Sequence, residues 1–276
     1  LLTESEVKND SFDDVDVAIT CESMSRPALF SIAPYYDDNR ADDVLHSSDH
    51  WTLSRESVSP PFPRKSYGFT TRAFSAGRQT AWLPQTRGMD SGRLPPILDF
   101  KPFRRGLGKP KQRKYYADLL RLDRSAVPTA SVLALQIVES IPRDERSPAR
   151  IAREMESFLS ADPRFEYTLD LSSKPIRGTD PIEQFLAVDR KGHCQYFASS
   201  LAMMLRSVHI PCRVVVGYRT EEYNGVGDYY IARQEHAHAW VEALIDRREI
   251  PREIRLPGET RTQRYWLRLD PTPGVS

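Results

Sequence analysis

Three residues in the C-terminal half of the chain have the types needed for nucleophilic catalysis: Cys194, His238 and Asp270. Cys194 follows Gly192 and His193 at the start of a predicted helix, where backbone N–H groups and the helix dipole stabilise a thiolate. The same N–H groups can stabilise an oxyanion formed at an attacked carbonyl. Position alone also allows a buried, inert cysteine, so the nucleophile assignment depends on the other two residues.

His238 begins a predicted strand, His238–Ile245, whose side chains alternate between two faces. The apolar face has Ala239, Val241, Ala243 and Ile245, and the opposite face has His238, Trp240 and Glu242. A second predicted strand, Tyr265–Leu269, is followed by Asp270 and then by Pro271, which stops the strand. If the two strands pair as a hairpin, His238 and Asp270 lie at the same end of it. The carboxylate would then orient the imidazole, whose other ring nitrogen faces the thiol.

Hydrophobic periodicity predicts the elements that must position these residues. Helices are expected over Val132–Ile141, over Pro148–Leu159 with Ser147 as its N-cap, from Pro181 onward, and from Cys194 to a point before Pro211. Strands are expected over Cys212–Tyr218, Tyr229–Arg233, His238–Ile245 and Tyr265–Leu269. Helices followed by a run of strands indicate an α+β fold in which helices pack on an antiparallel sheet.

Two domains are predicted, residues 1–112 and residues 113–276. The first is expected to be small and β-rich, with candidate strands at Val15–Ile19, Ala28–Tyr36, His50–Ser54, Tyr67–Phe74 and Thr80–Leu83. It ends in the segment Lys101–Lys114, which has seven basic residues and no acid. We interpret this segment as a solvated linker; the alternative is a patch attracted to anionic lipid or polymer.

Four motifs around the three candidate residues resemble those of the transglutaminase-like superfamily. They are Gly192-His193-Cys194-Gln195-Tyr196-Phe197-Ala198, the segment Arg206–Tyr218, Ala237-His238-Ala239-Trp240-Val241-Glu242, and Leu269-Asp270-Pro271-Thr272-Pro273. The resemblance is to the bacterial branch, in which this domain lies outside the cytoplasmic membrane between transmembrane segments. It covers residues from about 115 onward and is loose before them.

The resemblance implies a papain-like, transglutaminase-core domain with a Cys194–His238–Asp270 triad. It implies acyl transfer or hydrolysis on protein or peptide amides through a thioester, so that a transglutaminase, a peptidase and a deamidase are all open. The expected partner is a protein or peptide substrate, and no cofactor or metal is required. The expected location is periplasmic, with membrane anchoring through segments outside this chain.

Four further residues are candidates for the substrate cleft: Gln195, Trp240, Trp266 and His236. For the two tryptophans a purely structural role is equally open. His236 stands where relatives often have an acid, and His209 and Cys212 stand where Gly and Ala are usual. The connection Asp246–Arg264 is longer than usual. These departures affect the expected substrate preference more than the expected activity.

Composition excludes several other classes of protein. The chain has 276 residues with 39 basic and 38 acidic side chains. This balance gives no strong positive electrostatic potential that would attract the phosphates of nucleic acid. Three cysteines are too few for a disulfide scaffold. The longest uncharged runs have 14 residues, short of the ~18 expected of a membrane-spanning helix. The chain starts without Met and ends just after the aspartate motif, so we expect a domain cut from a longer protein.

Two other functions are open from the sequence. A zinc-dependent hydrolase could use ligands from among His193, Cys194, His236, His238 and Asp270, although no familiar zinc motif is present. A catalytically inactive module could keep the fold as a binding or scaffolding domain. The presence of all three triad residues argues against the second.

Overall fold

The structure is a computed structural model that describes residues 15–22, 28–32, 35–36, 44–47, 52–55, 64–71, 82–84, 110–170, 172, 174–249 and 264–274. The chain divides into two compact units, which we describe separately. Unit 1 comprises residues 1–92 and 246–266, and unit 2 comprises residues 93–245 and 267–276. The domain boundary expected after residue 112 falls inside a helix of unit 2 and stays a prediction.

The described N-terminal elements of unit 1 are strands, in agreement with the β-rich prediction for this part of the chain. One sheet has the order β1 (Val15–Cys21), β6 (Lys65–Thr71), β3 (Tyr35–Tyr36), and another has the order β2 (Ala28–Leu29), β5 (Thr52–Arg55), β4 (Val44–Ser47). Strand β7 (Trp82–Pro84) follows. The hydroxyl of Tyr67 accepts from the N–H of Phe30 and donates to its carbonyl oxygen, each at 2.8 Å. These two bonds connect β6 to the segment that follows β2.

The described part of unit 2 begins with α2 (Pro110–Leu119), so the expected linker Lys101–Lys114 is helical from Pro110 onward. Proline fits the first turn of a helix, and lysine, arginine and glutamine are good helix formers. The charge pattern alone therefore did not distinguish a linker from a helix start. Residues 101–109 lie outside the described part of the chain.

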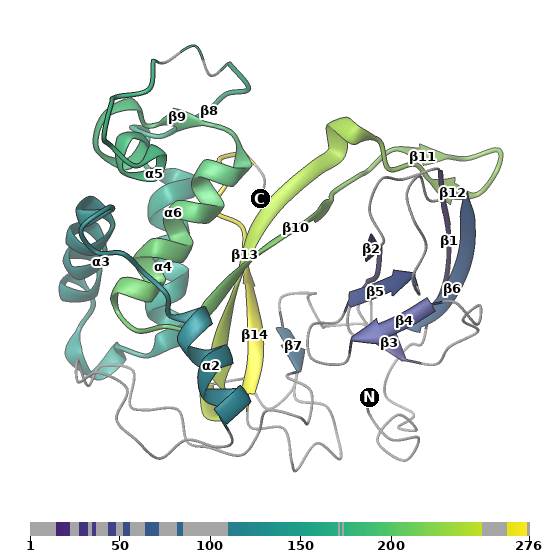
Figure 1. Cartoon of the computed structure of the whole chain (residues 1–276), viewed down its shortest axis with the longest axis horizontal. Coiled ribbons are helices and arrows are strands. Elements are labelled where there is room, and N and C mark those ends of the chain that lie inside the picture. Colours follow the sequence, from purple (N-terminus) through teal and green to yellow (C-terminus); the bar gives the residue numbers. More distant parts are fainter. Residues whose placement is uncertain are drawn as a thin grey trace. The chain divides into compact units, whose positions relative to one another are not determined.

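Helices α3 (Pro128–Ser140), α4 (Pro148–Ala161) and α6 (Cys194–Ser207) form the helical layer of unit 2. Figure 1 shows them together on one side of the strands β10, β13 and β14. The Ser147 hydroxyl accepts from the N–H of Arg150 and caps α4, as its sequence predicts. The buried face of α4 consists of Ile151, Ala152, Met155 and Leu159. This face fixes which side of α4 is turned to the core.

Short elements between α4 and α6 lead the chain to Cys194. Helix α5 (Pro181–Gln184) continues into a π-helical turn, η3 (Phe185–Asp189), and the next residue, Arg190, adopts a left-handed conformation with φ 55°. Strand β9 (Lys191–Gly192) then pairs in parallel with β8 (Glu166–Tyr167). The backbone N–H of Thr168 donates to the Gly192 carbonyl at 2.9 Å. Two-residue strands leave no periodicity in the sequence, so neither was predicted.

Strand β13 (Ala237–Asp246) is flanked in its sheet by β10 (Cys212–Tyr218) and by β14 (Arg264–Leu269). Strands β10 and β13 are antiparallel, and Gly217 lies opposite His238. The hairpin β11 (Tyr223–Asn224) and β12 (Tyr229–Tyr230) lies between β10 and β13 in the sequence. Short 3-10 turns complete the described elements: η2 (Arg143–Glu145), η4 (Gln234–His236) and η5 (Arg247–Glu249).

The predicted α+β fold with helices on an antiparallel sheet is thus observed in unit 2. Strand β10 has the predicted bounds, and β13 and β14 each begin one residue earlier than expected. Two predicted elements differ more: the strand expected over Tyr229–Arg233 ends at Tyr230, and the helix expected from Val132 begins at Pro128. Among the described residues, no helix combines the length and the apolar character that a bilayer crossing requires.

Candidate active site

Cys194 is the first residue of α6, where the predicted helix start placed it. The N-cap is His193, whose Nδ1 accepts from the N–H of Gln195 at 3.3 Å. The apolar residues Phe197, Ala198 and Leu201 of α6 have no exposed surface and hold the helix in the core. The thiol is itself buried, with 8% of its residue exposed. The nucleophile candidate is therefore held on a rigid element.

The surroundings of Cys194 favour the thiolate. Burial acts to raise the pKa of the thiol, but hydrogen bonding with the His238 side chain and with the N–H groups of Ala239 and Gln195 outweighs it. The net effect is a pKa below the ordinary value for cysteine. A thiolate next to an imidazolium is the reactive form of a cysteine nucleophile.

The structure brings His238 and Asp270 together as the hairpin hypothesis requires. His238 Nε2 lies 2.6 Å from Asp270 Oδ2, so Nδ1 is the ring nitrogen left to face the sulfur. Hydrogen bonding with Asp270, and then with Cys194, raises the pKa of His238 to about 9 although burial opposes it. With this pKa, the imidazole favours its charged form at neutral pH.

Asp270 is fixed by groups on several sides. The N–H of Thr272 donates to Oδ1 at 3.2 Å, and the Arg219 Nη1 lies 3.9 Å from Oδ2. Its own backbone N–H donates to the Glu156 Oε1 of α4 at 2.6 Å. Sequence reasoning missed both Glu156 and Arg219. For Glu156 a signal was present: an acid at this position lies within the apolar stripe of α4, four residues after Ala152 and three before Leu159.

Trp240 lies beside the imidazole on the same face of β13. The two rings are stacked, with centroids 6.4 Å apart and planes inclined by 23°. The guanidinium of Arg268 lies over the indole, 5.5 Å from its centroid, and Arg268 lies 3.8 Å from Glu242. Glu242 is also bound by Arg213 at 2.6 Å. His238, Trp240 and Glu242 thus form a row along this face of β13. The two rings are stacked, and Arg268 contacts both the indole and Glu242.

Gly217 makes room for the indole. A Cβ atom built at this position would lie 2.6 Å from the Trp240 Cη2, closer than real Cβ contacts come. We expect Gly217→Ala to displace Trp240, to lower the free energy of unfolding by about 1–3 kcal/mol, and to reduce turnover about tenfold or more. Thermal unfolding, indole fluorescence and activity check this. Gly225→Ala is the matched control because its Cβ would meet nothing closer than 3.8 Å, and equal effects of the two variants would contradict the prediction.

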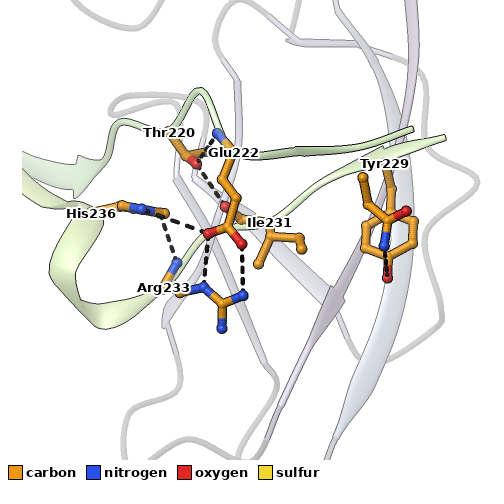
Figure 2. Close-up of polar contacts among 7 residues, drawn as sticks. Thr220, Glu222, Tyr229, Ile231, Arg233 and His236 are labelled. Atoms are coloured by element: carbon orange, nitrogen blue, oxygen red, sulfur yellow. Dashed lines mark hydrogen bonds and ion pairs between the residues drawn. The ribbon is translucent and has the colours of Figure 1, made fainter. Parts of the chain in front are cut away.

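His236 is engaged at the base of the β11–β12 hairpin. Its Nδ1 accepts from the N–H of Arg233 at 3.1 Å, and its Nε2 lies 3.9 Å from Glu222 Oε2. Figure 2 shows His236 and Arg233 converging on the Glu222 carboxylate, which Arg233 binds with two nitrogens. Thr220 bonds to the Ile231 carbonyl across the same hairpin. These contacts explain His236 as an anchor of the hairpin, and a role in the substrate cleft stays a prediction.

The other two cleft candidates differ in exposure. Gln195 is exposed on the first turn of α6, next to Cys194. Trp266 has no exposed surface, so its burial favours the structural role that the sequence left open over a wall of a cleft.

The other two cysteines, Cys212 and Cys21, are reduced thiols in different surroundings. Cys212 is fully buried at the start of β10 and donates to the Ala202 carbonyl at 3.4 Å. Burial raises the pKa of this thiol to about 11, so it stays protonated. Cys21 is buried at the end of β1, with its sulfur 3.8 Å from the Tyr67 hydroxyl. Of the three cysteines, Cys194 is the one at a helix N-terminus whose thiol pKa is lowered by a histidine.

The arrangement gives the zinc hypothesis no support. Within the described ranges, which include all five proposed ligands, no group of three or more His, Cys, Asp or Glu side chains could hold a metal ion. Asp270 instead binds Nε2 of the His238 imidazole at 2.6 Å.

Comparisons with known proteins find relatives of the C-terminal half of the chain. Residues 135–271 match the family described as the transglutaminase-like superfamily. Over 112 residues, 41% of the chain, it is 36% identical to protein-glutamine gamma-glutamyltransferase of Pseudomonas aeruginosa. Over 126 residues, 44% of the chain, it is 29% identical to the uncharacterized protein YebA of Bacillus subtilis. The matches span only 14% and 15% of these two relatives.

The fold also resembles a solved structure. The crystal structure of the periplasmic domain of TgpA from Pseudomonas aeruginosa, bound to ethylmercury, aligns with a TM-score of 0.62. The alignment covers 94% of this chain and 72% of that one at 23% identity. This likeness extends the shared fold beyond the residues that match in sequence.

Proposed function

Because residues 135–271 belong to the transglutaminase-like superfamily, we propose that this chain is a cysteine-dependent acyl-transfer enzyme. Cys194 is the nucleophile, His238 the acid and base, and Asp270 the residue that orients the imidazole. One observation carries the proposal: Nε2 of the His238 ring lies 2.6 Å from Asp270 Oδ2, and the same histidine lowers the pKa of the Cys194 thiol at the start of α6. Neither a structural cysteine nor a metal site requires this arrangement.

The chemistry follows from the protonation states of the pair. The Cys194 thiolate attacks an amide carbonyl carbon, and the C–N bond breaks as the His238 imidazolium gives its proton to the departing amine. A thioester and a neutral imidazole remain. The imidazole then takes a proton from water or from a second amine as this nucleophile attacks the thioester. The thiolate leaves, and the thiolate–imidazolium pair is restored.

The amide of a glutamine side chain is the donor to test first. The Pseudomonas aeruginosa relative is named for transfer of the gamma-glutamyl group of protein-bound glutamine. Transfer to water would deamidate the glutamine, and transfer to a primary amine would form a cross-link. Hydrolysis of backbone amides by the same thioester route is the alternative outcome.

We also propose that the domain works outside the cytoplasmic membrane as part of a larger membrane protein. The matches cover about a seventh of the length of each curated relative, and the solved domain of similar fold is periplasmic. Its substrates would then be proteins or peptides of the cell envelope.

Selective alkylation tests the proposed nucleophile. At pH 7, iodoacetamide should modify Cys194 about tenfold or more faster than Cys21 or Cys212, because its thiol has the lowered pKa. Peptide mass spectrometry after brief labelling measures the three rates separately. Equal labelling of all three cysteines, or none at Cys194 in folded protein, would favour the inactive-module alternative.

The pH dependence of turnover tests the imidazolium. Activity on a glutamine peptide should rise with pH as Cys194 loses its proton, at a lower pH than an ordinary thiol does, and should fall above pH 9. The fall is expected because His238, with its pKa raised to about 9, no longer has a proton for the departing amine at higher pH. Ammonia release measures this profile. A rate that keeps rising through pH 10 would exclude His238 as the acid.

A further inference from the structure

Glu156 is an acidic residue on the inner side of a helix that carries no other candidate site residue. It lies on α4 between the buried residues Ala152 and Leu159, and 17% of its side chain is exposed. A carboxylate in such a place loses hydration, and burial accordingly raises the pKa of Glu156. An apolar residue at this position would pack against the core without losing hydration. Packing of α4 therefore does not explain why an acid stands here.

Both oxygens of the carboxylate have partners. Oε2 accepts from the Arg153 Nη1 at 2.9 Å, one turn earlier on α4. Oε1 accepts from the backbone N–H of Asp270 at 2.6 Å, across 114 residues of sequence. Asp270 comes directly after the last residue of β14, and Pro271 follows it. Its N–H therefore lies at the end of the strand, and Glu156 supplies the acceptor.

This bond bears on the orientation of the imidazole. The Asp270 Oδ2 binds His238 Nε2, and the position of Oδ2 depends on where the backbone of Asp270 is held. Thr272 fixes the other carboxylate oxygen, but from the same turn, so it moves with Asp270. The hydrogen bond from the Asp270 N–H to Glu156 connects this turn to α4 and so to the helical layer. The same layer includes α6, which carries Cys194.

We propose that Glu156 is a positioning residue of the active site, which holds the backbone of Asp270 and through it the His238 imidazole at the thiolate. The inference rests on the proposed function and adds a fourth residue to its machinery. The acceptor oxygen is the required feature, and the negative charge is secondary. Misplacing a catalytic group by about 1 Å can cost about 10²-fold in rate.

Three substitutions separate the acceptor from the charge and from the volume. Glu156→Gln keeps an acceptor oxygen and removes the charge, so we expect turnover within about threefold of wild type. Glu156→Ala removes the acceptor, and Glu156→Met removes it while filling most of the space. For both we expect turnover to fall by about 10- to 100-fold and alkylation of Cys194 at pH 7 to slow several-fold. Alkylation slows because a loosely held His238 loses the raised pKa that keeps it charged.

Glu154→Ala is the matched control on the same helix. Glu154 pairs with Arg150 at 2.9 Å on the surface, so its loss should change neither rate. Turnover and alkylation of all variants are measured across pH 5–10, with thermal unfolding recorded alongside. If Glu156 had only a structural role, its substitution would lower the unfolding temperature and leave the pH profiles of turnover and alkylation unchanged. If Glu156→Ala does not fold, Glu156→Met and Glu156→Gln carry the comparison.

The outcomes separate the two proposals. Wild-type protein without selective labelling of Cys194 would overturn the proposed function itself. Selective labelling in wild type with profiles for Glu156→Met equal to those of Glu154→Ala would overturn the positioning role alone. Equal losses in Glu156→Gln and Glu156→Met would also overturn it, because the charge and not the acceptor would then matter.

Discussion

Replacing Cys194 by alanine should abolish turnover, with a loss of roughly 10⁴- to 10⁶-fold on any amide substrate of the wild-type protein. The reason is that the sulfur forms the covalent bond of the intermediate, and no other group near it can take that role. The thiol is small and 8% of the residue is exposed, so the variant should fold. Ammonia release and amine incorporation, each measured with a glutamine peptide, check the loss.

The matched control is Cys212→Ala. Cys212 is equally small and fully buried, but burial raises its pKa to about 11 and it lies beyond the other end of α6. This variant should lose some stability and keep its activity. The prediction is contradicted if Cys194→Ala retains turnover, or if both variants lose it to a similar extent.

Replacing His238 by alanine should have the second largest effect, a loss of about 10³- to 10⁴-fold in turnover. Two functions disappear together: the departing amine has no proton donor, and the thiolate loses its main stabilising partner. Because hydrogen bonding and charge from His238 both lower the pKa of Cys194, that pKa should rise in the variant. Alkylation of Cys194 at pH 7 should therefore slow, and its pH profile should move to higher pH.

His236→Ala is the control for this experiment. His236 lies two residues earlier in the sequence and contacts Arg233 and Glu222. Its loss should loosen the β11–β12 hairpin without shifting the alkylation profile of Cys194. If His236→Ala moved the profile as far as His238→Ala, the assignment of the imidazole that binds the thiol would be wrong.

Local patterns in the sequence were enough to predict the elements that hold the triad. Alternation over β13 separates core residues such as Val241 from polar ones such as His238, and burial in the structure follows that division for these two. The N-cap and proline at Ser147–Pro148 predicted where α4 begins, and Gly192 marked the approach to α6. These signals are local because capping and side-chain alternation are decided within a few residues.

Contacts between distant segments could not be predicted in the same way. The bond from Asp270 to Glu156 joins residues 114 positions apart, and nothing in either local pattern specifies the other. The parallel pair β8 and β9 has two residues in each strand. Trp240 and Trp266 looked equivalent as aromatic residues on neighbouring strands, yet Trp266 has no exposed surface. Which face of a strand is covered depends on the packing of the whole unit.

The alternation of side chains along β13 also limits how this site can change by mutation. Core residues and the row from His238 to Glu242 share one strand, so inserting or deleting a single residue within it would exchange the two faces beyond that point. The imidazole or the indole would then exchange faces with the neighbouring alanine and valine side chains. Substitutions therefore change the side chains of this strand one at a time. Adding or removing one residue would instead disrupt both the core packing and the active site.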